Sequence, residues 1–145
     1  MNVDFSRIED VEVFASIPEG TYVCAITDVR EGTTRDGSPR WALRLEVQDG
    51  DFAGRTAAWD GLNWSERGMQ RVKYVLDKLG FDVDGELELQ PDDLLGRQVL
   101  VSVLTEERED PLTGIRQVRM RVPYMGYESV EVLNGGLPRP GELGR

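Results

Sequence analysis

The segment that decides the fold is Gly20–Trp64, which reads GTYVCAITDVREGTTRDGSPRWALRLEVQDGDFAGRTAAWDGLNW. It predicts three consecutive β-strands. Thr21–Arg30 is rich in β-branched and aromatic residues and contains no Gly or Pro. In Arg40–Gln48 apolar residues alternate with charged ones, which predicts one apolar face and one face that carries arginines. Arg55–Asp60 follows as the third strand, so we expect a meander with arginines on its exposed surface.

Two turn-forming segments separate these strands. The first, Glu31–Pro39, contains Gly32 and Gly37, and glycine adopts positive φ without a steric penalty. The second has the sequence Asp-Gly-Asp at residues 49–51, which predicts a tight hairpin turn. Each turn is therefore expected to join two antiparallel neighbours.

After the third strand the pattern becomes helical. In Ser65–Leu79 apolar residues recur at spacings of three and four, which gives one apolar stripe made of Met69, Val72, Leu76 and Leu79. Ser65 is expected to be the N-cap and Gly80 the C′ residue. Gly68 lies inside this segment and is expected to weaken the helix by ~1 kcal/mol.

Residues 81–124 are predicted to form a connector and two more strands. Phe81–Gln90 is an acidic connector, and Pro91–Gly96 is expected to form one helical turn. Strands are predicted at Arg97–Glu106 and at Ile115–Tyr124, joined by a hairpin loop. Three strands, one helix and two strands is the order of elements in an OB-fold. We therefore expect a mainly β protein, a five-stranded OB-fold-like Greek-key barrel with one helix between strands three and four.

The OB-fold domain is expected to span residues 18–132. Residues 1–17 are interpreted as a leader that packs on the sheet through Val11, Val13 and Ile17. Residues 133–145 are Gly- and Pro-rich, which predicts a flexible tail.

Composition bears on the location of the protein. No apolar run approaches the ~20 residues that span a bilayer, and residues 1–10 lack the apolar core of a signal peptide. The single cysteine, Cys24, cannot form an internal disulfide and is expected to be a buried packing residue. We therefore expect a cytoplasmic protein with no membrane partner.

The sequence contains no histidine. This excludes histidine-based zinc sites, Ser-His-Asp triads and imidazole acid–base chemistry. Asp82, Asp84 and Glu86 are spaced as in a calcium loop, but Leu87 stands where the turn glycine belongs, so a solvated connector is favoured. We expect no enzyme, no catalytic residues, no metal and no cofactor.

The net charge is −10, which taken alone argues against nucleic acid. The charge is segregated, however. Asp82–Asp93 holds six acids and no base, whereas Ile115–Tyr127 holds three arginines and no acid. A local basic surface is therefore compatible with the acidic total.

Several segments match the pattern of one known family: Pro18–Tyr22, Ala25–Val29, Trp41–Gly50, Phe52–Arg55, Trp59–Asn63 and Leu94–Val99. Through them the chain resembles the DUF669 family of phage and prophage proteins over roughly residues 17–127. The resemblance implies an OB-fold that binds single-stranded DNA and is encoded among replication and recombination genes. It also implies a location in a bacterial cell or a phage-infected host.

Single strands are bound by a basic groove and by aromatic side chains that stack on bases. Arginines lie on strand two, on strand five, at the first loop and at the start of strand three, and the candidates are Arg40, Arg44, Arg119, Arg121, Arg30, Arg35 and Arg55. The alternative is a solvated face with salt bridges, for example from Glu46.

The three tryptophans are expected to have different roles. Trp41 shares the parity of the apolar residues of its strand and is predicted to lie in the core. Trp59 and Trp64 are the candidates for stacking on bases, with structural packing as the alternative.

Together these features favour a protein that binds single-stranded DNA with low sequence specificity in phage or prophage DNA replication or recombination. The alternative is an OB-fold protein-interaction module that serves a replication or recombination partner through its acidic surface, without binding DNA. The sequence leaves a homo-oligomer open.

Overall fold

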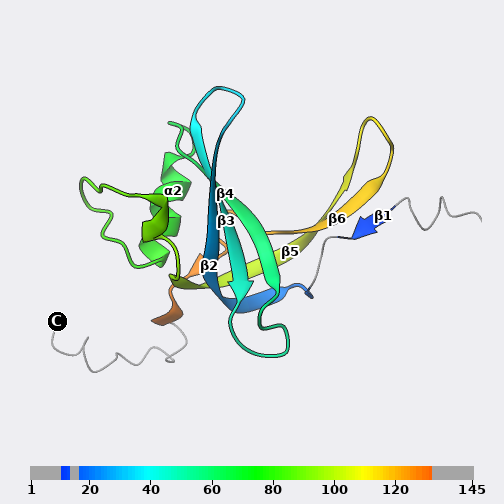
Figure 1. Cartoon of the computed structure of the whole chain (residues 1–145), viewed down its shortest axis with the longest axis horizontal. Helices are drawn as coiled ribbons and strands as arrows, with labels where there is room; N and C mark the ends of the chain where they lie inside the picture. The colour runs from blue at the N-terminus through cyan, green and yellow to red at the C-terminus, as the bar shows by residue number, and fades with distance from the viewer. Residues whose placement is uncertain (1–10, 14–16, 132–145) are drawn as a thin grey trace, which may run out of the picture.

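A computed structural model describes the backbone of residues 11–13 and all of residues 17–131. This part of the chain consists of one sheet and a single α-helix (Figure 1). The elements are β1 (Val11–Val13), β2 (Gly20–Thr33), β3 (Pro39–Val47), β4 (Thr56–Asn63), α2 (Met69–Lys78), the 3-10 turn η1 (Pro91–Asp93), β5 (Gln98–Glu109), β6 (Arg116–Arg121) and β7 (Tyr127–Glu128). The prediction of a mainly β protein, with a helix between the third and fourth long strands, is confirmed.

Two short strands were not predicted. β1 pairs in parallel with β6, and β7 pairs antiparallel with β5. Ile17, which was expected to pack on the sheet, is buried in the core. Residues 1–10, 14–16 and 132–145 lie outside the described residues, and with them most of the predicted leader and the whole predicted tail.

The two longest strands each pair with two partners along their length. Residues 20–25 of β2 pair with β5, and residues 24–33 pair with β3. In the same way β5 pairs first with β2 and then, over residues 104–109, with β6. The register of β2 shifts between Ile26 and Asp28, where a bulge bends the strand. The sheet therefore curls around its core, as the crossing ribbons in Figure 1 show.

The order of the sheet is β1-β6-β5-β2-β3-β4, with β7 added on β5. β4 and β6 contact each other, but no ladder between described residues joins them. We call this junction the β4–β6 seam. The sheet curls without closing into a barrel.

The core lies inside this curl and is apolar throughout. Its fully buried members include Ile26, Leu43, Leu45, Val47, Val99 and Val101, which come from β2, β3 and β5. Trp41 packs against this core while partly buried, as its parity predicted. α2 contacts β4 and β7 and buries three residues, Val72, Val75 and Leu76. Met69, predicted in the apolar stripe, is instead 44% exposed because it begins the helix.

The helix begins later than predicted. Gly68, not Ser65, is the N-cap, and the Ser65 hydroxyl accepts a hydrogen bond from the Gly68 amide in a turn that precedes the helix. A Cβ atom on Gly68 would overlap the backbone oxygen of Asn63, so this position requires glycine. The helix ends as predicted at Gly80, with φ 99° and the paired hydrogen bonds of a Schellman motif.

The tight turn predicted at residues 49–51 is wrong. β3 ends at Val47 and β4 begins at Thr56, so a longer loop joins them. Gly50 has the expected positive φ, but a second such glycine, Gly54, donates its amide hydrogen to the Val47 carbonyl and closes the loop. Arg55 therefore ends this loop and does not begin the strand.

Candidate nucleic-acid interface

The arginines of β3 project from the face of the sheet opposite the buried one. β3 pairs with β2 on one side and with β4 on the other, so the same face continues onto both neighbouring strands. Arg44 is the partner of Trp59 in β4, and Ala42 is the partner of Arg30 in β2. Paired residues project from the same side of a sheet. The predicted residues that the structure brings together here form what we call the arginine face: Arg30, Arg40, Arg44 and Trp59.

Arg30 and Trp59 form a cation–π pair on this face. The guanidinium carbon of Arg30 lies 4.5 Å from the centroid of the indole ring, within the range of a cation–π interaction. Trp59 is 41% exposed, and Arg30 also donates to the Asp28 carboxylate at 3.2 Å. The pair places a cation over one face of an exposed aromatic ring, and a cation and an aromatic ring are the two groups that bind a single strand.

Arg40 lies over a glycine of the next strand. A Cβ atom on Gly61 would lie 2.6 Å from the guanidinium carbon of Arg40, so only glycine leaves room for this conformation. No carboxylate of the described residues forms an ion pair with Arg40. Of the arginine face, this side chain is the one best placed to meet a phosphate.

Arg44 is bound within the protein. It donates to the hydroxyls of Thr56 at 2.8 Å and Thr27 at 2.7 Å, and to the Glu46 carboxylate at 2.7 Å. The predicted alternative, a salt bridge to Glu46, is therefore present, within one strand and not across two. It neutralises part of the charge of the arginine face.

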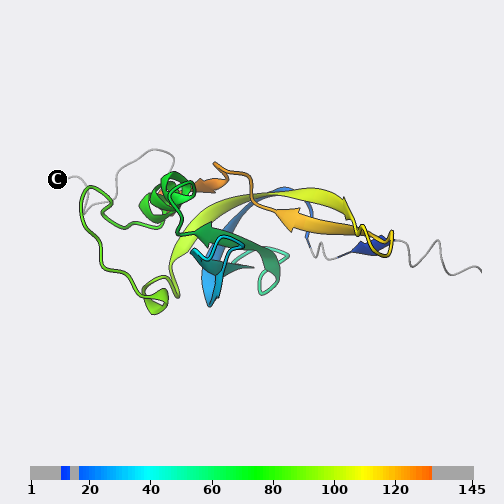
Figure 2. The same cartoon turned by 90° about the horizontal axis from the view of Figure 1, so that it is seen from above.

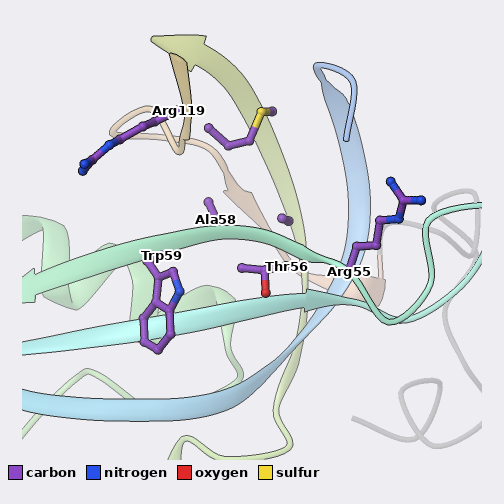
Figure 3. A pocket seen from close by; sticks show the side chains of 7 residues that line it. Arg55, Thr56, Ala58, Trp59 and Arg119 are labelled. Carbon is purple, nitrogen blue, oxygen red and sulfur yellow. The ribbon is translucent and has the colours of Figure 1, made fainter. Parts of the chain in front are cut away.

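A cavity of about 520 Å³ opens at the β4–β6 seam (Figure 3). Its walls are Arg55, Thr56, Ala57, Ala58, Trp59, Arg119 and Met120. The two alanines are buried and form a small-residue floor. Figure 3 shows Arg55 and Arg119 on opposite sides of Ala58, with Trp59 beside it. Trp59 thus belongs both to the arginine face and to this cavity.

The other predicted residues lie apart from this centre. Arg35 lines a shallow cavity at the β2–β3 loop together with Arg67, which no pattern in the sequence indicates. In the same loop, hydrogen bonds from Thr34 and Ser38 lower the pKa of Asp36. Arg121 is exposed on β6, two positions from Arg119.

Trp64 is placed differently from Trp59. Its ring packs edge-on against Trp41, 4.8 Å between centroids, and it lines a separate cavity beside α2. Its indole nitrogen is buried and has no hydrogen-bond partner among the described residues. The structure therefore does not bring Trp64 to the arginine face.

Sequence reasoning also missed a polar network behind the arginine face. The Asp60 carboxylate accepts hydrogen bonds from Arg71 at 2.9 Å and from the Tyr127 hydroxyl at 2.6 Å. Burial, and then the Asp60 charge, raise the pKa of Tyr127 well above its usual value. No local pattern relates these residues, which come from β4, α2 and β7. The network ties α2 and β7 to the sheet and holds Asp60 away from the site.

Within the described residues, no cluster of carboxylates and cysteine could hold a metal ion. The one α-helix there is too short and too polar to cross a membrane.

The fold and the site define a mainly β domain with arginines around an exposed tryptophan on its outer face. Residues 1–119 match the family model described as "Protein of unknown function (DUF669)", and the chain belongs to this family. A search of curated proteins found no match.

Proposed function

We propose that this protein binds single-stranded DNA with little sequence preference, as an OB-fold protein of phage or prophage replication or recombination. The observation that carries the proposal is the stack of Arg30 on the exposed ring of Trp59, beside an Arg40 that has no ion-pair partner in the described part of the chain. A base can stack on the indole, and a phosphate can pair with the guanidinium groups.

The strand order supports the OB-fold part of this proposal. The chain β2, β3, β4, α2, β5, β6 has the five strands and the intervening helix of that fold. Its β6-β5-β2-β3-β4 path is open only between β4 and β6, and the OB-fold is a partly open barrel. OB-folds bind oligonucleotides on the surface of strands two and three and at the loop between strands one and two. Here those positions are β3, β4 and the loop of Arg35.

The acidic net charge limits the expected affinity. Asp28 and Glu46 already pair with Arg30 and Arg44 on the same face. We therefore expect binding that is appreciable at low salt and falls steeply as salt rises, since phosphate contacts release counterions.

Tryptophan fluorescence tests this proposal. Titration with oligo-dT at low salt is expected to quench the emission. Replacing the exposed indole (Trp59→Leu) should remove most of the quenching and weaken binding, because a base–aromatic stack contributes ~1–3 kcal/mol. The matched control is Trp64→Phe, whose indole lies away from the arginine face. Absence of both quenching and gel retardation at low salt would refute DNA binding.

A further inference from the structure

A second surface lies between α2 and the connector of residues 81–90, and it shares no lining residue with the cavity at the β4–β6 seam. Figure 2 shows this connector leaving the end of α2 and looping outward before η1. The helix and the connector enclose a groove of about 240 Å³, which we call the connector groove. Its walls are Trp64, Met69, Val72, Lys73, Leu76, Val83, Gly85, Leu87 and Leu89.

The connector has two sides with different chemistry. Its odd-numbered residues from 83 to 89 all line the groove, and three of them are apolar. Its even-numbered residues from 82 to 88 are all acidic and exposed. Met69 and Leu87, at 44% and 41% exposure, leave apolar surface open at the groove. An apolar groove with an acidic border results.

The acids of this border are uncompensated. In the described part of the chain none of Asp82, Asp84, Glu86 and Glu88 forms an ion pair. Lys73 is the one cation among the residues that line the groove. Among the described residues, seven of the twelve arginines lie on strands of the sheet, and four of these seven form ion pairs with carboxylates of the sheet. The border of the connector groove therefore carries four exposed acids against one cation in the lining, Lys73, beside an apolar floor.

We propose that the connector groove docks a segment of a partner protein that combines apolar side chains with lysines or arginines. The apolar side chains would cover Met69 and Leu87, and the cations would meet the connector acids. Charge complementarity of this kind steers association and selects partners. The same acids repel phosphate, so the groove is not a continuation of the arginine face. DNA and the partner segment are expected to bind independently.

The tryptophan side chains give a site-resolved test. Trp64 lines the connector groove and Trp59 the β4–β6 seam, so their indole N–H signals in a ¹H–¹⁵N NMR spectrum report the two surfaces separately. The probe is a synthetic amphipathic peptide of lysine and leucine, added to the full chain. It should shift the Trp64 signal and leave the Trp59 signal in place. A shift of the Trp59 signal without that of Trp64 would overturn the proposal.

Peptide variants separate apolar from ionic contributions. A peptide with serine in place of leucine tests the apolar floor, and one with glutamate in place of lysine tests the acidic border. Both are expected to bind much more weakly than the parent peptide. If the serine peptide binds as tightly as the parent, the attraction is charge alone and the connector groove is not a docking site.

Protein variants locate the contact. The double variant Asp84→Asn/Glu86→Gln should weaken peptide binding about fivefold, since each exposed ion pair contributes modestly. Leu87→Ser should weaken it as well, with an unchanged thermal midpoint because Leu87 is exposed. The matched control, Asp49→Asn/Asp51→Asn, removes the same charge from the β3–β4 loop and should bind the peptide normally. Equal weakening by the control would overturn the proposal.

One further outcome would assign the groove to a different occupant. If the protein alone self-associates in sedimentation velocity, and Asp84→Asn/Glu86→Gln abolishes that association, the groove binds a second copy of the chain and not a separate partner. Oligo-dT binding should be unchanged in both groove variants, which keeps this test independent of the proposed DNA binding.

Discussion

At the scale of single residues, the site depends on what stands opposite each arginine. Arg44 meets two hydroxyls and a carboxylate, whereas the Arg40 guanidinium lies over Gly61 and forms no ion pair with any described residue. The parity of β3 predicted that both arginines point outward. It could not predict which of them is neutralised, because that depends on Thr27 and Thr56 from the neighbouring strands.

The glycine opposite Arg40 gives a residue-scale prediction. Gly61→Ala should displace the Arg40 guanidinium and weaken oligo-dT binding, without loss of stability, because φ at Gly61 is not positive and the displaced group is the end of a flexible chain. Binding weakens as salt rises, so the slope of the logarithm of the association constant against the logarithm of the salt concentration is negative. Arg40→Ala should make this slope shallower by about 0.7, the contribution of one phosphate contact. Fluorescence titrations across a salt series measure both effects. If Gly61→Ala binds like the wild type while Arg40→Ala is weakened, the geometry at Gly61 has no role.

At the scale of elements, local patterns predicted the strands and the end of the helix but not features that depend on distant contacts. The start of α2 follows from the close approach of Gly68 to Asn63. Buried and exposed side chains do not alternate along β4. The register of its pairing with β3 shifts beside Leu45, so that two consecutive residues, Ala57 and Ala58, are both buried. β7 has only two residues and exists because it pairs with Leu100 and Val101, near the start of β5. No periodicity in the sequence encodes these contacts.

The network that joins α2 to the sheet gives an element-scale prediction. Tyr127→Phe should lower the free energy of unfolding by about 1–3 kcal/mol, because the partly buried Asp60 carboxylate loses the hydrogen bond that the buried Tyr127 hydroxyl donates to it. Tyr124→Phe is the control, since the Tyr124 ring is exposed. Urea denaturation measures both. Equal stability of the two variants would show that the Tyr127 hydroxyl does not support the helix.

At the scale of the whole molecule, the acidic chain separates its charges. Arginines gather on the sheet, and uncompensated acids gather on the connector beside α2. The sequence predicted this segregation from the acid run at Asp82–Asp93. It could not predict the open β4–β6 seam, which depends on how far the bent β2 and β5 carry the sheet around its core.

Stability of the whole molecule should fall in alkaline solution. Burial, followed by the charge of Asp49, raises the pKa of Cys24 from 9.0 to about 12, and the pKa of Tyr127 is raised above 10.0. Both groups stay neutral in the folded protein while the unfolded chain loses their protons. Stability is therefore full below about pH 9 and declines as the pH rises toward 12.

Denaturation at stepped pH with a Cys24→Ala variant isolates the cysteine contribution. The variant is less stable at neutral pH because it leaves a cavity, but its stability should decline less between pH 9 and 12 than that of the wild type. Parallel curves for the two proteins would show that Cys24 does not titrate as described.

Fluorescence anisotropy of labelled oligo-dT at low salt measures directly whether the arginine face binds single-stranded DNA. The wild type should bind, and the double variant Arg30→Ala/Arg40→Ala, with an unchanged thermal midpoint, should bind at least about tenfold more weakly, since it loses two phosphate contacts and the stack on Trp59. Wild-type affinity in the folded double variant would show that DNA does not bind at the arginine face, and no binding by either protein would show that the protein does not bind single-stranded DNA.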